Sequence, residues 1–102
     1  MIRLSSALQS SLEAGTVTIT AEVMPPRGGD ASHALEMARA LKGLVHAVNV
    51  TDGSRAVMRM SSLAVARLLL DEGIEPVLQM ACRDRNRIAI QADLLGAHAL
   101  GI

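Results

Sequence analysis

One acidic residue stands out in the stretch TITAEVMPPRGGD, residues 18–30. Glu22 closes an apolar, β-branched run and comes just before a double proline. An ionised carboxylate in apolar surroundings is costly unless it is paired or protonated. Glu22 is therefore either the structural partner of a nearby arginine or a carboxyl group used in catalysis. The residue pattern alone leaves both interpretations open.

Polar residues also follow the next two apolar runs of the chain. Asn49 lies near the end of the run LVHAVNV, and Thr51 and Asp52 follow it; Gln79 lies near the end of the run EPVLQMA, and Cys82 follows it. Side chains of these types can contact a ligand. Simpler interpretations stay open, because TDGS is ordinary turn chemistry and Cys82 reads as a small buried hydrophobic residue. The spacing alone predicts no more than a ligand-binding α/β protein.

The basic residues are weaker signals. The stretch CRDRNR (82–87) either solvates the start of a helix or clamps an anionic ligand. The three histidines fall on different expected elements and lack the spacing of metal ligands, so no metal site is expected. They are His33, His46 and His98.

Three strands and four helices are expected to position these residues. Short apolar runs predict strands at 16–23, 44–50 and 75–81. Helical spacing and capping residues predict helices in 4–14, from Asp30 to Gly43, in 61–73 and in 84–96. A glycine is expected to stop each helix, at Gly15, Gly43, Gly73 and Gly96. The final stretch HALGI predicts the approach to a fourth strand.

The order of these elements predicts the fold class. Strand and helix alternate about every 30 residues, which is the size of a βα unit. The strands are apolar on both faces, which is typical of a parallel sheet covered by helices. The polar residues follow the carboxyl ends of the strands, where α/β proteins build their sites, and the loops there are long. This favours a barrel over an open dinucleotide-binding sheet, which would need GxGxxG after the first strand.

Composition excludes several classes of protein. The chain has 102 residues, a formal net charge of zero and no Phe, Tyr or Trp. Its core is therefore expected to be aliphatic, and no nucleic-acid partner is expected. The apolar runs are far too short to span a membrane, and the start MIRLSSALQS lacks the apolar centre of a secretion signal. The single cysteine excludes an internal disulfide and suits a reducing cytoplasm.

Three segments carry more specific information: AEVMPPRGGD, VNVTDGSRAVMRMSS and ACRDRNRIAIQADLLGAHALGI. They closely resemble methylenetetrahydrofolate reductase, and best its short type from anaerobic and acetogenic bacteria. The resemblance implies a TIM-type (β/α)8 barrel that reduces 5,10-methylenetetrahydrofolate to 5-methyltetrahydrofolate in one-carbon metabolism and methionine biosynthesis. Residues 1–102 would then be one partial barrel domain, an N-terminal helix at 4–14 followed by three βα units. This domain would be truncated before strand four and belong to a longer enzyme.

The resemblance implies that Glu22 is the general acid. The methylene carbon of the substrate lies in a five-membered ring, which opens only when the departing nitrogen receives a proton. A carboxylic acid in a mostly apolar barrel mouth can keep that proton near neutral pH, because desolvation disfavours the charged form. Hydride then comes from a reduced flavin.

The resemblance also implies the cofactor and the partners. The loop after the second strand would contact the flavin, which makes Thr51, Asp52 and Ser54 candidate cofactor-binding residues. Gln79 stands where the enteric type has histidine and can still hydrogen-bond a flavin. The implied flavin is FAD, with FMN as the alternative, and the electron donor is NAD(P)H or another reductant. The implied partners are folate or a related pterin, further copies in a homo-oligomer, and in some relatives a second, metal-containing subunit.

Two other functions stay open at this point. A truncated half-barrel could serve as a non-catalytic assembly module, and a flavin-free barrel could bind a pterin and transfer methyl groups. Three of the eight strands of a barrel cannot close it, so the 102-residue chain alone is expected to be a weak or inactive binder.

Overall fold

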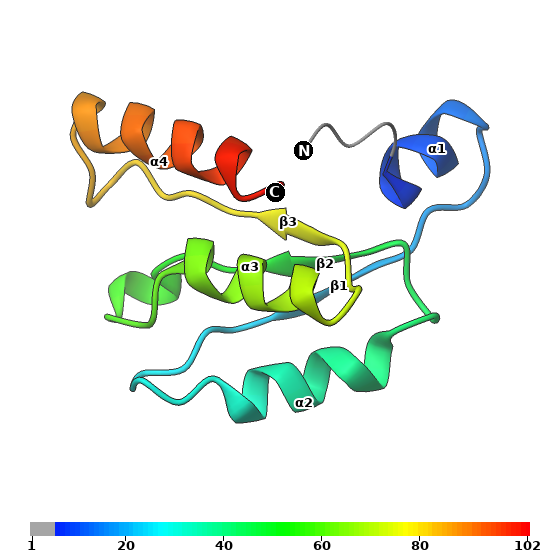
Figure 1. Cartoon of the computed structure of the whole chain (residues 1–102), viewed down its shortest axis with the longest axis horizontal. Helices are drawn as coiled ribbons and strands as arrows, with labels where there is room; N and C mark the ends of the chain where they lie inside the picture. Colours follow the sequence, from blue (N-terminus) through cyan, green and yellow to red (C-terminus); the bar gives the residue numbers. More distant parts are fainter. Residues whose placement is uncertain (1–5) are drawn as a thin grey trace.

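The computed structural model describes residues 6–102 and contains the three expected βα units (Figure 1). In chain order its elements are α1 (Ala7–Glu13), β1 (Thr20–Val23), α2 (Ser32–Leu41), β2 (Ala47–Val50), the 3₁₀ turn η1 (Ser54–Ala56), α3 (Ser62–Asp71), β3 (Pro76–Leu78) and α4 (Arg87–Ala99). The helix expected over 4–14 is observed as α1, and the start of that prediction lies outside the described residues. The strands are shorter than the apolar runs that predicted them.

The strands form a parallel sheet in the order β1-β2-β3. Glu22 pairs with Asn49, which pairs with Val77, while Val23 pairs with Val50. Side chains alternate between the two faces of a strand, so Glu22, Asn49 and Val77 share one face and Val23 and Val50 share the other. The parallel sheet expected from the apolar strands is confirmed. It is an open sheet with alternating helices, compatible with the start of a TIM-type barrel.

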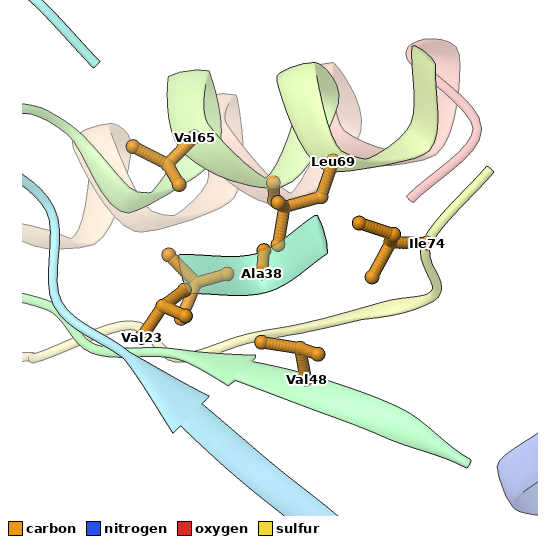
Figure 2. Packing of buried hydrophobic residues seen from close by; sticks show 8 residues of the cluster. Val23, Ala38, Val48, Val65, Leu69 and Ile74 are labelled. Carbon is orange, nitrogen blue, oxygen red and sulfur yellow. The ribbon is translucent and has the colours of Figure 1, made fainter. Parts of the chain in front are cut away.

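The core lies between the sheet and helices α2 and α3 (Figure 2). Val23 and Val48 point from the strands toward Ala38 of α2 and toward Val65 and Leu69 of α3. None of these five side chains is more than 4% exposed. All are aliphatic, as expected for a chain without aromatic residues, and their burial is the main favourable contribution to folding.

The ends of α2 and α3 follow the sequence signals closely. Gly43 and Gly73, which stop these helices, have φ angles of +82° and +74°, a conformation that other residues rarely adopt. Asp30 accepts a hydrogen bond from the N–H of Ser32 at 2.9 Å, although the N-cap position itself is Ala31. Asp30 therefore satisfies one of the free N–H groups of the first helical turn, but it does so from the residue before the N-cap and not from the N-cap itself.

The end of α4 differs from the prediction. The sequence predicts a helix that stops at Gly96, but α4 continues through the first two residues of HALGI. A glycine inside a helix costs only about 1 kcal/mol relative to alanine, so Gly96 does not stop it. The stop is Gly101, with φ +81°. The N–H of Gly101 donates to the carbonyl of His98 (3.1 Å) and that of Ile102 to the carbonyl of Ala97 (3.0 Å), the pattern that closes a helix at a left-handed glycine.

Helix α4 keeps much of its apolar surface exposed within the described residues. Ala97 is its only buried residue in that range, whereas Ile88, Leu94 and Leu95 are 70%, 55% and 73% exposed. The central helix α3, by contrast, turns Leu69 fully into the core. The open position beside β3 and α4 is where a further βα unit packs in a TIM-type barrel.

Candidate functional site

The loops that follow the three strands lie together at one end of the sheet, on the left in Figure 1. We call this end the carboxyl edge and define it as residues 24–31, 51–61 and 79–86. The opposite end, the amino edge, comprises the turns 42–46 and 72–75 together with α1. In α/β barrels the carboxyl edge carries the ligand-binding and catalytic groups.

Glu22 lies in β1, with its side chain exposed to solvent. Within residues 6–102 it forms no hydrogen bond and no ion pair, so it has no arginine partner there. Its surroundings are more open than the expected apolar barrel mouth, because β1 is an edge strand and no other described strand pairs with its free side. A small cleft of about 190 Å³ lies beside it, lined in part by Met24, His33 and Met37.

The double proline after Glu22 is held by the loop after β2. Arg59 donates from Nη1 to the carbonyl of Pro25 (3.1 Å), and the N–H of Met60 donates to the carbonyl of Pro26 (2.7 Å). The Nε of Arg59 is buried without a hydrogen-bond partner among the described residues. Proline restricts its own backbone, and these contacts fix the direction of the segment. Sequence reasoning missed Arg59, because nothing in VMRMSS separates it from a solvated arginine.

Thr51 extends β2 by one residue, since its N–H donates to the carbonyl of Val23 (3.3 Å). The alternation of a strand places its side chain on the same face as Asn49 and Glu22. Thr51 is 6% exposed, and its hydroxyl is buried without a hydrogen-bond partner among the described residues. A buried hydroxyl without a partner costs free energy, so this one is suited to contact a ligand atom. Its position and chemistry fit a flavin ring, which carries donors and acceptors along its edge.

Asp52 joins two loops of the carboxyl edge. Its Oδ2 accepts the N–H of Ala81 (2.7 Å) and a hydrogen bond from Nη1 of Arg85. Arg85 also donates from Nε to Asp93 of α4 (3.1 Å). Burial raises the pKa of Asp52, but the hydrogen bonds from Arg85 and Ala81 outweigh it, so the pKa lies below its ordinary range. The contact to Arg85 could not be read from the sequence, where CRDRNR indicates only a cluster of charges.

Ser54 lies in a strained part of the same loop. It begins η1, in which Arg55 and Ala56 have φ angles of +61° and +58°. Non-glycine residues in this region cost about 1–3 kcal/mol each and concentrate at functional loops. The hydroxyl of Ser54 makes no hydrogen bond to other described residues, which leaves it free to contact a ligand.

The loop after β3 carries Gln79 and Cys82. The N–H of Gln79 donates to the carbonyl of Val50 (3.2 Å), and its own carbonyl accepts from the hydroxyl of Ser62 (2.9 Å). Its backbone is therefore fixed while its side chain is exposed. The prediction that Cys82 is a buried hydrophobic residue is wrong, because Cys82 lies in the loop beyond the strand and is exposed.

A cleft of about 400 Å³ lies between the loops that follow β2 and β3. Arg59, Arg83 and Arg85 line it, together with Asp52 and Asp84. Arg83 pairs with Asp84 at 2.7 Å, and Arg85 pairs with Asp52. This pairing leaves Arg83 and Arg85 little net charge to offer to an anionic ligand. Arg59, which donates to the carbonyl of Pro25, makes no ion pair with another described residue.

Within residues 6–102, no group of three or more His, Cys, Asp or Glu side chains could hold a metal ion. Among the histidines, His46 is occupied, since its Nδ1 accepts the N–H of Ile19 (3.0 Å). No helix in the described part of the chain is long and apolar enough to cross a membrane.

Two groups of expected site residues can now be distinguished. Glu22, Thr51 and Gln79 are brought to one face of the sheet at or beside its carboxyl edge. Asp52 and Ser54 lie in the loop beyond, where Asp52 is engaged by a neighbouring loop.

A family model described as methylenetetrahydrofolate reductase matches residues 7–102. No curated protein and no solved structure matches the chain. The matched range includes the three βα units and every expected site residue.

Proposed function

The chain belongs to the methylenetetrahydrofolate reductase family, and from this membership we propose that it takes part in the flavin-dependent reduction of 5,10-methylenetetrahydrofolate to 5-methyltetrahydrofolate. The family itself indicates an oxidoreductase of folate one-carbon metabolism. The observation that supports the finer proposal is the register of the sheet. It puts Glu22 on the same face as Thr51 and Gln79, next to the loops of the carboxyl edge.

Glu22 is the proposed general acid. The methylene carbon of the substrate is bonded to two ring nitrogens, and the ring opens to an iminium ion when one nitrogen is protonated as its C–N bond breaks. A protonated carboxyl group supplies that proton and is left as a carboxylate. Glu22 is engaged by no other described residue, so its carboxyl group is free to meet a substrate. A substrate lying over this exposed face would desolvate the carboxyl group and favour its protonated form.

Thr51, Ser54 and Gln79 are the proposed cofactor contacts. When bound, the flavin supplies the hydride that reduces the opened substrate. The unpartnered hydroxyl of Thr51 and the exposed amide of Gln79 can offer hydrogen bonds to the polar edge of its ring. Asp52, the other residue expected to bind the cofactor, belongs to the same loop, and Arg85 holds its carboxylate. Its contribution to flavin binding is proposed to come through the position of this loop. FAD is the proposed flavin, FMN is the alternative, and NAD(P)H or another reductant is the electron donor.

The remaining contacts of the site are proposed to come from outside the described residues. β1 and β3 are the edges of an open sheet, and edge strands present unpaired backbone groups. In this proposal residues 1–102 are one partial barrel domain of a longer cytoplasmic enzyme that acts on folate or a related pterin. The enzyme forms a homo-oligomer or works with a second, metal-containing subunit.

Flavin content and turnover test this proposal in the intact protein. The purified protein should show flavin absorption bands and reduce methylenetetrahydrofolate. Glu22→Gln keeps the shape of the side chain and removes the acid, so it should lower turnover by about 10²–10⁴-fold with flavin still bound. Glu36→Gln, at an exposed position of α2, is the matched control and should leave both unchanged. A colourless protein, or full turnover in Glu22→Gln, would refute the proposal.

The open sheet favours one alternative, a non-catalytic assembly module. The exposed apolar side chains of α4, including Leu94 and Leu95, would then meet another chain. This alternative requires a colourless protein in which Glu22→Gln changes only stability. A flavin-free methyl transferase would also be colourless, but it would bind a pterin.

A further inference from the structure

Two loops of the carboxyl edge are joined through one mostly buried ion pair. Asp52, after β2, accepts hydrogen bonds from the N–H of Ala81 (2.7 Å) and from Nη1 of Arg85, both after β3. The same Nη1 donates to the carbonyl of Ala81 (2.7 Å), and Nε donates to Asp93 of α4 (3.1 Å). The side chains of Asp52 and Arg85 are 12% and 17% exposed. We call this cluster of Asp52, Ala81, Arg85 and Asp93 the loop clamp.

The loop clamp lies next to two proposed cofactor contacts. Asp52 directly follows Thr51, and Ala81 comes two residues after Gln79. The hydroxyl of Thr51 has no partner among the described residues, so its position depends on the backbone that carries it. The N–H groups of Thr51 and Gln79 make the last ladder bonds of the sheet, at 3.3 and 3.2 Å. The loop clamp is the next connection between these two chain segments beyond the sheet.

We propose that Asp52 and Arg85 are positioning residues, which hold Thr51 and Gln79 at a fixed spacing for the flavin, and that the Asp52 carboxylate does not itself contact the flavin. The inference rests on the proposed function for the identity of the ligand. Oδ2 of Asp52 accepts two hydrogen bonds from the loop after β3, and only 12% of the side chain is exposed, which leaves little of it open to a ligand. A pair with this little exposed surface also keeps one geometry better than an exposed pair, because water and salt screen it less.

The loop clamp differs from the exposed contact beside it. Arg83 donates to the carbonyl of Gly53 (3.0 Å) and pairs with Asp84, and their side chains are 49% and 64% exposed. Exposed pairs are screened by water and salt and add little to rigidity. Arg83 therefore closes the rim of the cleft, while Asp52 and Arg85 determine the distance between the loops.

Positioning can be separated from two other roles. If Asp52 contacted the flavin directly, Arg85 would be dispensable and the two substitutions would act independently. If the pair were only a structural brace, its loss would lower the melting temperature without changing flavin affinity. If the two residues act through one shared geometry, losing either has the full effect and losing both adds nothing.

A double-mutant cycle in the intact protein tests this inference, with Asp52→Asn, Arg85→Gln and the two combined. FAD and FMN affinities are measured by flavin fluorescence. Each single variant should bind flavin about tenfold more weakly, as when a supporting contact of a binding group is lost. The double variant should be no weaker than the weaker single. Arg85→Lys keeps the charge but cannot reach Asp52, Asp93 and Ala81 together, so its affinity should lie in between.

A second measurement needs no flavin. In the flavin-free protein, the amide hydrogens of Thr51 and Gln79 should exchange faster in either single variant. A variant with Arg39→Gln and Glu72→Gln, which breaks the ion pair of the amino edge, should leave this exchange and the flavin affinity unchanged.

Additive losses of flavin affinity would overturn the inference in favour of a direct contact. Unchanged exchange at Thr51 and Gln79 would overturn it as well. A wild-type protein that binds no flavin would refute the proposed function, and the exchange rates would still decide whether the loop clamp positions the loops.

Discussion

The two ends of the sheet use their polar groups differently. At the amino edge, the carboxylate of Glu72 accepts hydrogen bonds from Nε and Nη2 of Arg39 (3.0 and 2.6 Å), and its carbonyl accepts one from Lys42 (2.6 Å). At the carboxyl edge, the hydroxyl of Thr51 and the Nε of Arg59 are buried without partners among the described residues. Unpartnered buried groups lower stability, so their place at this edge fits contact with another molecule.

The backbone shows the same contrast. The turns of the amino edge are short and reverse direction at Gly43 and Gly73, where a left-handed conformation costs little. In the carboxyl edge the same region of φ is occupied by Arg55 and Ala56, where it is strained. We therefore propose that the amino edge serves stability and the carboxyl edge serves ligand contact, the division found in α/β barrels. Substitutions at one edge should leave the property of the other unchanged.

The largest effect on stability is expected at Leu69, in the last turns of α3 above the amino edge. Leu69→Ala removes a fully buried side chain and should lower the free energy of unfolding by about 2–5 kcal/mol. Urea unfolding followed by far-UV circular dichroism measures it in a chain without aromatic residues. Leu44→Ala, at a position 71% exposed, is the control and should change stability by less than about 0.5 kcal/mol. If folded Leu69→Ala bound flavin more weakly, the division between the edges would be wrong.

A matched pair of glycines compares the two edges directly. Gly73 and Gly53 have φ angles of +74° and +55°, so an alanine at either position is strained by about 1–2 kcal/mol. The new Cβ would lie 3.1 Å from Nζ of Lys42 at the amino edge and 3.2 Å from Nη2 of Arg83 at the carboxyl edge. Both variants should melt at lower temperature, and only Gly53→Ala should weaken flavin binding. Equal flavin affinity of Gly53→Ala and Gly73→Ala would show that the two edges do not differ in their effect on flavin binding.

A smaller effect of opposite sign is expected at Thr51. Thr51→Val replaces the unpartnered hydroxyl with a methyl group of similar size. The flavin-free protein should be unchanged or up to about 1 kcal/mol more stable, because a buried polar group without a partner is removed. Flavin binding should become weaker, as measured by fluorescence titration, and Thr51→Ser should retain most of it. A loss of stability in flavin-free Thr51→Val would show that the hydroxyl has a partner within the protein.

Local signals explain why so much of the fold could be predicted from the sequence. Apolar runs located all three strands, and glycines with positive φ stopped helices at Gly43 and Gly73 as expected. The prediction that the last helix ends at Gly96 was wrong, because a glycine ends a helix only where the residues after it leave the helix. That condition is met at Gly101, where Ile102 packs against the core and closes the motif.

Long-range contacts explain why less of the candidate site could be predicted. The positions of Glu22, Thr51 and Gln79 follow from strand alternation, a local rule. The contact of Asp52 with Arg85 joins residues 33 positions apart, and several nearby carboxylates could have been the partner instead. The exposure of Cys82 likewise depends on where the strand ends, which short apolar runs leave uncertain by a few residues.

The smallest effect is expected from acid and salt on the two ion pairs. Burial raises the pKa of Asp52, but its hydrogen bonds lower that pKa by more than burial raises it. A hydrogen bond from Arg39 lowers the pKa of Glu72. A carboxyl group whose pKa is lowered in the folded protein stabilises the fold at pH values above its unfolded pKa of about 4. This stabilisation is lost as the pH falls through the folded pKa. Both pairs should therefore weaken in acid.

Salt at neutral pH should separate them, because exposed charges are screened more than buried ones. The side chains of Arg39 and Glu72 are 52% and 32% exposed, against 17% and 12% for Arg85 and Asp52. At about 1 M salt, Glu72→Gln should melt like the wild type while Asp52→Asn still melts lower, since the Debye length is then only about 3 Å. Asp84→Asn, which removes an exposed carboxylate next to the loop clamp, is the control. Like Glu72→Gln, it should melt at the wild-type temperature in about 1 M salt. Equal salt sensitivity of the two pairs would mean that the carboxyl edge is as open to solvent as the amino edge, and the loop clamp could not hold Thr51 and Gln79 in place.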